Sequence, residues 1–179
     1  MDIKFLTEFK SETEAKWRSR EINPAVYGFQ IQPDTKWNPG LSLDEIAQYE
    51  KFIGTQFPDD FRLMLQNING TDLPNLNVYG NSGEPYQTAI SLYAFPRDRQ
   101  LIGDRIQYTN DDRSEIAEVL LEYEDFKLST EAALVPIYGH RYLVCESDRT
   151  KSRVLSIVGT DVITYGPCLK DYLTREFLT

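Results

Sequence analysis

The stretch from Leu41 to Gly70 constrains the fold more than any other, because start and stop signals for two consecutive helices occur there together. Ser42 and Glu45 have the spacing of a capping box, in which a hydroxyl and a carboxylate each bond a backbone N–H of the first turn. Gly54 supplies the left-handed residue that ends a helix, and Pro58 suits the start of the next. The stretch therefore predicts two helices joined by a tight turn.

The apolar residues of this stretch recur at helical spacing, which predicts that both helices bury one face. They are Ile46, Ala47, Phe52, Ile53, Phe57, Phe61, Met64, Leu65 and Ile68. The polar face of the second helix begins with Asp59 and Asp60. Because phosphates are bound by Lys and Arg, this acidic face argues against a DNA-reading helix and favours a packing role.

The remaining elements are expected from hydrophobic periodicity and turn residues. Helices are expected over 3–20, from 112 to about 125 and over 169–177, and strands over 26–32, 76–79, 89–95, 133–138, 142–145, 153–158 and 162–165. Residues 97–105 are polar and ambiguous, and are compatible with a short helical turn. We expect one α+β domain: an antiparallel β-sheet with helices packed on one side and at the ends, in which residues 1–36 extend a core of 37–179.

The chain is acidic, with a formal net charge of −9 and a pI of about 4.7. This balance argues against nucleic acid and anionic membranes as direct partners, and fits either plain solubility or a basic protein partner. No apolar run approaches the roughly 20 residues that span a bilayer, and the N-terminus lacks the features of a signal peptide. We therefore expect a cytoplasmic protein with reduced cysteines.

Residues that could carry chemistry are sparse. His140 is the only histidine, and neither Cys145 nor Cys168 belongs to a metal or redox motif. A nucleophile or general base needs a partner within hydrogen-bond reach, and none can be placed from the sequence. The glycines of 80–83 lack the lysine of a phosphate-binding loop. We expect no catalytic, metal or cofactor site, and an enzyme would have to use His140, a cysteine or paired carboxylates.

The two-helix stretch resembles the N-terminal signature of the SUKH superfamily, which includes the Smi/Knr-like fungal cell-wall regulators and many bacterial immunity proteins. The matching residues are Leu43, Ile46, Glu50, Phe57, Pro58, Phe61, Leu65, Asn69 and Gly70. A weaker similarity continues in 135–137, 142–144 and 169–178. The resemblance implies the SUKH fold and a non-catalytic protein-binding domain.

Two binding roles follow from the resemblance. One is a cytosolic immunity protein that neutralises a toxin, often a nuclease, by stoichiometric binding; the alternative is a regulatory or scaffold domain like the fungal relatives. Acidic residues and tyrosines are the candidate contacts for a basic toxin domain, although the acidic residues also suit a solvated helix end. The candidates are Asp111, Asp112, Glu122, Glu124, Asp125, Tyr79 and Tyr86. A monomer and a homodimer are both compatible with the sequence.

Overall fold

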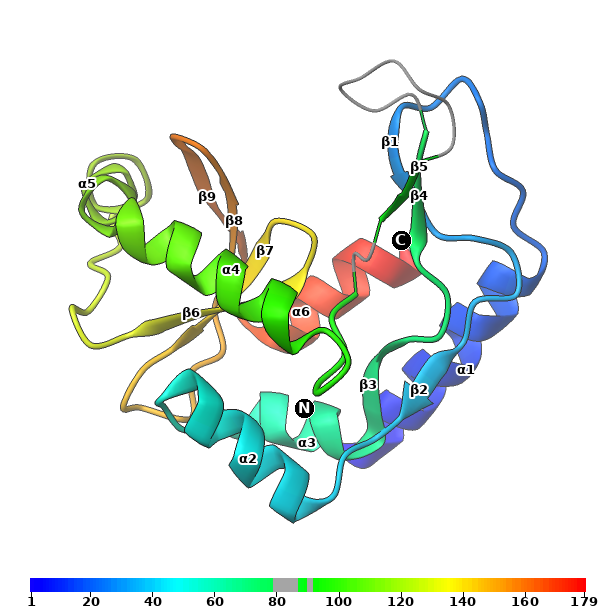
Figure 1. Ribbon diagram of the computed structural model, residues 1–179, viewed down its shortest axis with the longest axis horizontal. Coiled ribbons are helices and arrows are strands. Elements are labelled where there is room, and N and C mark those ends of the chain that lie inside the picture. Colours follow the sequence, from blue (N-terminus) through cyan, green and yellow to red (C-terminus); the bar gives the residue numbers. More distant parts are fainter. Residues whose placement is uncertain (79–86, 90–91) are drawn as a thin grey trace.

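The computed structural model describes residues 1–78, 87–89 and 92–179, which form short antiparallel sheets surrounded by helices (Figure 1). The helices are α1 (Ile3–Arg18), α2 (Leu43–Ile53), α3 (Asp59–Asn67), α4 (Arg99–Asp111), α5 (Arg113–Glu124) and α6 (Leu169–Leu173), the last continuing into a π-helical turn, η1 (Thr174–Leu178). The strands are β1 (Gly28–Gln30), β2 (Trp37–Pro39), β3 (Ile68–Thr71), β4 (Asn75–Val78), β5 (Gln87–Ala89), β6 (Ala133–Tyr138), β7 (Arg141–Cys145), β8 (Val154–Val158) and β9 (Asp161–Gly166).

The largest sheet is a four-stranded antiparallel meander with the order β6-β7-β8-β9. Its last two strands form the expected hairpin: Val158 pairs with Asp161 across a turn in which Gly159 has a φ of 55°. Two smaller sheets, β1-β4-β5 and β2-β3, lie beside it. The predicted α+β class with antiparallel strands is confirmed.

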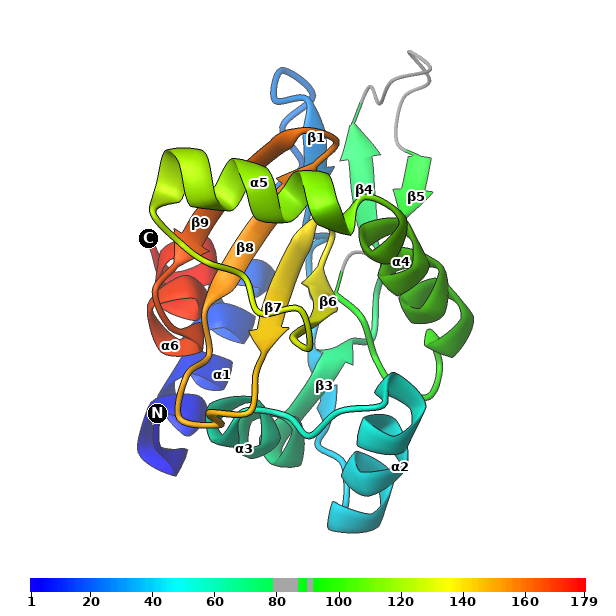
Figure 2. The ribbon, with the colours of Figure 1, turned by 90° about the vertical axis from the view of Figure 1, so that its left-hand side faces the viewer.

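The helices cover both faces of the four-stranded sheet, whereas the sequence led us to expect one covered side. Figure 2 shows α5 in front of the sheet and α6 behind it. Side chains alternate along a strand, so Leu143 and Cys145 of β7 enter one core with α1, α2, α3 and α6, while Tyr142 and Val144 enter a second core with α5. A strand buried on both faces is apolar at nearly every position. It lacks the alternation of apolar and polar residues from which a single buried face is predicted, so the sequence did not indicate how many faces are covered.

Helix α1 belongs to the larger core. Trp17 is 1% exposed and its ring lies 5.2 Å from that of Trp37 and 6.3 Å from that of Phe177. The indole N–H of Trp37 donates a 2.8 Å hydrogen bond to Thr13. Aromatic rings at these distances attract one another through their edges and faces. The N-terminal residues thus pack against the body of the same chain.

Three expectations need correction. Residues 97–105 are more than a helical turn, because α4 runs from Arg99 to Asp111. Of the strand expected over 89–95, Ala89 belongs to β5, residues 90 and 91 lie outside the described residues, and Leu92 forms an isolated bridge with Tyr138. Ile68, expected on the buried face of the second helix, is instead the first residue of β3, because the chain turns straight from α3 into a strand that pairs with β2.

Candidate partner-binding surfaces

The α2–α3 stretch is held by its own polar groups. The Glu45 carboxylate accepts the Ser42 backbone N–H at 2.8 Å, which completes the predicted capping box, and Gly54 ends α2 with a φ of 83°. Glu50 accepts the Phe57 N–H at 2.8 Å and a guanidinium N–H of Arg62 at 2.5 Å. The Glu50 carboxylate therefore joins α2 to the turn at Phe57 and to α3 at Arg62, and it has a structural role.

The Asn-Gly pair clasps a distant loop. The Asn69 amide donates to the Phe95 carbonyl at 2.6 Å and accepts the Phe95 N–H at 3.0 Å, as a neighbouring strand would. Gly70 has a φ of 65°, and a Cβ there would lie 2.8 Å from the Ala94 Cβ. Only glycine fits this close approach in a left-handed conformation. Glu50, Asn69 and Gly70, three of the residues that carry the family resemblance, thus have structural roles.

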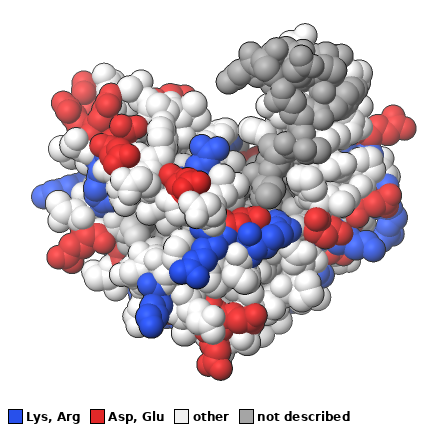
Figure 3. All heavy atoms as spheres, viewed as in Figure 1, with Lys and Arg blue, Asp and Glu red and all other residues white. Residues whose placement is uncertain are grey.

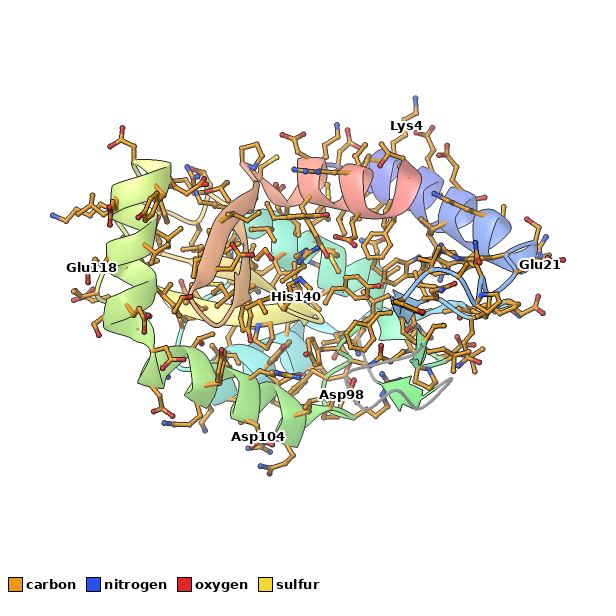
Figure 4. All side chains as sticks on the ribbon, turned by 90° about the horizontal axis from the view of Figure 1, so that it is seen from above. Lys4, Glu21, Asp98, Asp104, Glu118 and His140 are labelled. Atoms are coloured by element: carbon orange, nitrogen blue, oxygen red, sulfur yellow. The ribbon has the colours of Figure 1, made fainter. Side chains whose placement is uncertain are left out.

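The most acidic surface of the molecule lies on and around α5. Positions three or four residues apart share one helix face, and the exposed residues Glu115, Glu118, Leu121, Glu122 and Asp125 have this spacing. Figure 3 shows carboxylates gathered over this helix, and in Figure 4 Glu118 points away from the body of the molecule. We call these five residues the α5 face.

The α5 face also exposes apolar area. Leu121 is 56% exposed, and its neighbour Tyr123 is 72% exposed at the end of the helix. A hydrogen bond to Glu122 raises the pKa of the Tyr123 hydroxyl. Leu121 thus lies among the carboxylates of the α5 face, whereas Tyr123, two residues further along, exposes its ring on another side of the helix end.

The predicted acidic residues lie at the two ends of α5. Asp112 is at the same time the last cap of α4 and the first cap of α5, and Asp111, which accepts a 2.6 Å bond from Gln107, precedes it. Glu122 and the half-buried Glu124 lie in the last turn, and Asp125 ends the helix with a φ of 48°. The other two candidates, Tyr79 and Tyr86, lie outside the described residues.

Sequence reasoning missed the two carboxylates that connect these ends. Glu115 and Glu118 lie between them on the same face. The signal that could have identified them is their spacing: Glu115 lies three residues before Glu118, and Glu118 lies four before Glu122. Residues 111–125 contain seven carboxylates and one guanidinium, a net charge of −6 out of −9 for the whole chain. The acidity of the protein is therefore concentrated on one segment.

A second candidate surface is a small pocket beside the β6–β7 turn. It has a volume of about 170 Å³ and is lined by Phe29, Tyr138, Gly139, His140, Arg141 and Glu176. The Nε of Arg141 lies 3.3 Å from a carboxylate oxygen of Glu176, and both side chains are largely buried. Of these residues, only His140 was singled out from the sequence. The others come from β1, β6, β7 and η1, elements whose proximity only the fold reveals.

His140 is half-buried at this pocket. Burial lowers the pKa of its imidazole, and the charges of Arg141 and Arg105 lower it further against the opposite effect of Asp161. The imidazole makes no hydrogen bond to any residue among 1–78, 87–89 and 92–179. The structure therefore offers no acid–base pair around the histidine within these residues.

Neither cysteine is placed as a nucleophile. Cys145 is buried in β7, and burial raises the pKa of its thiol, which disfavours the reactive thiolate. Cys168 is half-buried and borders a larger cavity of about 490 Å³ together with Lys151 and Arg153. His140 lies in a different pocket from Cys168, so the two do not form the pair that nucleophilic catalysis needs.

Two further searches cover the described part of the chain only. In it, no group of three His, Cys, Asp or Glu residues is arranged to hold a metal ion. The helices found there are all too short or too polar to cross a membrane.

The fold and these surfaces define an α+β domain whose polar and apolar surface groups suit the binding of another protein. Comparison with known families identifies the family to which this domain belongs. Residues 40–150 match the model of the SMI1 / KNR4 family (SUKH-1), and the chain belongs to that family. The predicted SUKH membership is thereby confirmed. The family supports a protein-interaction or immunity-type domain in general and is generally non-catalytic. No curated protein matches the chain.

Proposed function

We propose that this protein is an immunity protein that neutralises a basic toxin domain by binding it stoichiometrically in the cytoplasm. The single observation that carries the proposal is the concentration of charge on residues 111–125, with a net charge of −6 next to the exposed side chains of Leu121 and Tyr123. Membership of the SMI1 / KNR4 family supports the general class.

The physical basis is complementarity. A nuclease binds its phosphate-rich substrate with Lys and Arg, so its active-site cleft attracts a carboxylate-covered helix. Opposite charges raise the rate of encounter, and burial of exposed apolar side chains such as Leu121 then slows dissociation. Tyr123 is suited to act as an anchor because tyrosine combines a large apolar ring with a hydroxyl. The bound helix would cover the substrate-binding cleft, so inhibition needs no turnover.

The test is inhibition of the toxin encoded beside this gene. With increasing amounts of this protein, toxin activity should fall to zero at a one-to-one ratio. Activity that persists at an excess of the protein would refute the immunity role. Capture of several unrelated cellular proteins instead would favour the alternative role, a regulatory or scaffold domain.

A charge-reversal pair locates the interface. Glu118→Lys combined with Glu122→Lys places two lysines on the α5 face and should weaken binding by about 10- to 100-fold, mainly by lowering the association rate. The association rate of this variant should also depend less on salt concentration than that of the unmodified protein. The matched control is Glu8→Lys combined with Glu12→Lys, because these residues are exposed four positions apart on α1. Each pair raises the net charge from −9 to −5. Equal weakening by both pairs would show that only overall charge matters and would remove α5 as the binding face.

A further inference from the structure

The pocket beside the β6–β7 turn lies far from the α5 face. In Figure 1 the β1-β4-β5 sheet, whose strand β1 provides Phe29, and α5 occupy opposite sides of the molecule, and Figure 4 shows His140 near the middle. Phe29 is 46% exposed and forms the apolar part of the lining, while Tyr138, His140 and Glu176 provide polar groups. A volume of about 170 Å³ is suited to one side chain of a partner.

Several polar groups in and behind this pocket lack a hydrogen-bond partner among the described residues. Glu176 uses one carboxylate oxygen for Arg141, and its other oxygen is unpaired. The Tyr138 hydroxyl accepts a 2.9 Å bond from the Asn75 amide, whose own oxygen is buried and unpaired. The buried hydroxyl of Tyr172 is unpaired as well. Of these groups, the carboxylate of Glu176 and the hydroxyl of Tyr138 belong to residues that line the pocket, so a polar ligand in the pocket would meet these acceptors.

The charge of Arg141 is already committed. Its guanidinium donates to the Ser156 hydroxyl at 2.9 Å, lies 3.8 Å from the centre of the Tyr165 ring and pairs with Glu176. These contacts hold it against the sheet. The groups of the pocket that remain available are hydrogen-bond acceptors: the second oxygen of Glu176, the imidazole of His140 and a lone pair of Tyr138.

We propose that this pocket receives one lysine or arginine side chain of the partner protein, with Glu176 as the counter-charge, His140 and Tyr138 as acceptors, and the Phe29 ring against the cation. The proposal rests on the proposed function for the identity of the partner, a basic protein, and adds a second contact point to the α5 face. Aromatic rings attract cations held over their faces, which gives Phe29 its role.

The free acceptors of the pocket and the net charge of the chain favour a cation over a carboxylate. A ligand carboxylate would face Glu176, and the overall charge of −9 opposes its approach. Burial, Arg141 and Arg105 all lower the pKa of His140, so the imidazole is neutral near pH 7 and remains an acceptor. Glu176 offsets Arg141, and Asp161 acts on His140 in the sense opposite to Arg105. A bound cation therefore meets a nearly neutral pocket with acceptors available.

The test uses His140 itself, because the only histidine of the chain gives one set of imidazole proton resonances in NMR spectra. The probe is Nα-acetyl-L-lysine N-methylamide, and the controls are the norleucine and glutamate analogues. The lysine probe should shift the His140 resonances saturably, with a dissociation constant in about the millimolar range expected of a single side chain. At saturation the pKa of His140 should fall further, because a cation beside the imidazole disfavours its protonation.

Variants separate the pocket from the rest of the surface. Glu176→Gln should weaken binding of the probe by about tenfold or more, because the charged acceptor is lost. The control Glu118→Gln removes a carboxylate from α5 and should leave the binding unchanged. Phe29→Leu changes a half-exposed ring, leaves the Arg141–Glu176 pair intact and should also weaken binding, which covers the case that Glu176→Gln disturbs the fold.

Three results would overturn the proposal: no saturable shift with the lysine probe, a stronger response to the glutamate analogue, or unchanged binding in both pocket variants. None of these results bears on the α5 face, because the experiment contains no toxin. Conversely, a toxin that is not inhibited would refute the proposed function while the lysine probe still reports on the pocket. The two proposals therefore fail separately.

Discussion

Two helix pairs in this molecule are built in opposite ways. The α2–α3 pair has a capping box, a left-handed glycine at Gly54 and the partly buried carboxylate of Glu50, which links both helices. The α4–α5 pair has no side-chain hydrogen bond at either N-cap, and α5 ends with Glu122 and Glu124 and no basic residue in its last turn. Carboxylates at that end oppose the helix dipole.

The comparison distinguishes polar groups that stabilise the fold from polar groups that remain exposed on the surface. The Glu50 carboxylate of α2 is used for internal hydrogen bonds, so it is unavailable to a partner. Polar groups on the outer side of α5 make few internal bonds and remain available, at some cost in helix stability. The following substitutions compare the stability of well-bonded parts of the fold with that of less constrained positions.

The largest effect is expected from truncation in the α2–α3 core. Phe57 is fully buried, and its ring lies 4.9 Å from that of Tyr49 and 5.0 Å from that of Phe61. Phe57→Ala should lower the free energy of unfolding by about 3–5 kcal/mol, because it removes buried area and leaves a cavity. Leu121→Ala on the exposed side of α5 should change it by less than about 0.5 kcal/mol. Urea unfolding measures both, and a similar loss in the two variants would contradict the division.

The next effect concerns the clasp between Asn69 and Phe95. Asn69→Ala leaves the buried N–H and carbonyl of Phe95 without their partner and should cost about 2–3 kcal/mol. Asn67→Ala is the control, because its amide bonds only the Leu63 carbonyl one helical turn earlier, at 2.8 Å, and should cost about 0.5 kcal/mol. Thermal unfolding compares the two variants. Equal costs would show that the clasp adds nothing beyond a local bond.

Capping gives a smaller contrast. Ser42→Ala should destabilise the protein by about 1 kcal/mol, because its hydroxyl accepts the Glu45 N–H at 3.3 Å. Asp112→Ala at the start of α5 should change stability by less than about 0.5 kcal/mol, since the Asp112 side chain makes no cap bond there. Chemical denaturation of both variants provides the comparison, which fails if Asp112→Ala proves the more harmful.

The smallest expected effect has the opposite sign. Glu122→Lys replaces an acid in the last turn of α5 with a base and should stabilise the protein by about 0.3–1 kcal/mol, because the helix dipole favours positive charge at that end. The same variant should bind the toxin more weakly. Glu118→Lys, one turn earlier, is the control and should stabilise less. Loss of stability in Glu122→Lys would show that the acidic end supports the fold.

The sequence predicted elements whose signals are local. The α2–α3 pair was predictable because its caps, turn glycine and apolar spacing lie within thirty residues, 41–70. Helix α4 was missed because its buried positions, such as Ile102 and Thr109, include a threonine that counts as polar, and its start has no capping side chain. Here tertiary packing overrides weak local propensity.

The binding surfaces were predictable only in part. Acidic residues near α5 were identified from charge alone, whereas Glu115 and Glu118 stand apart from other acids in the sequence and join them only on the helix face. The pocket could not be inferred, since Phe29, Arg141 and Glu176 are distant in the sequence and meet through the fold. Local sequence carries information on helix ends and charge, whereas a pocket depends on contacts between distant segments.

Helix α5 touches its core through only a few side chains, among them the buried Ile116 and Leu120. Its outer positions can therefore be replaced without disturbing the packing of the sheet. Substitutions on this helix face can therefore accumulate during evolution while the buried residues of the fold stay the same. Partner choice and foldability can then evolve as separate traits of one gene.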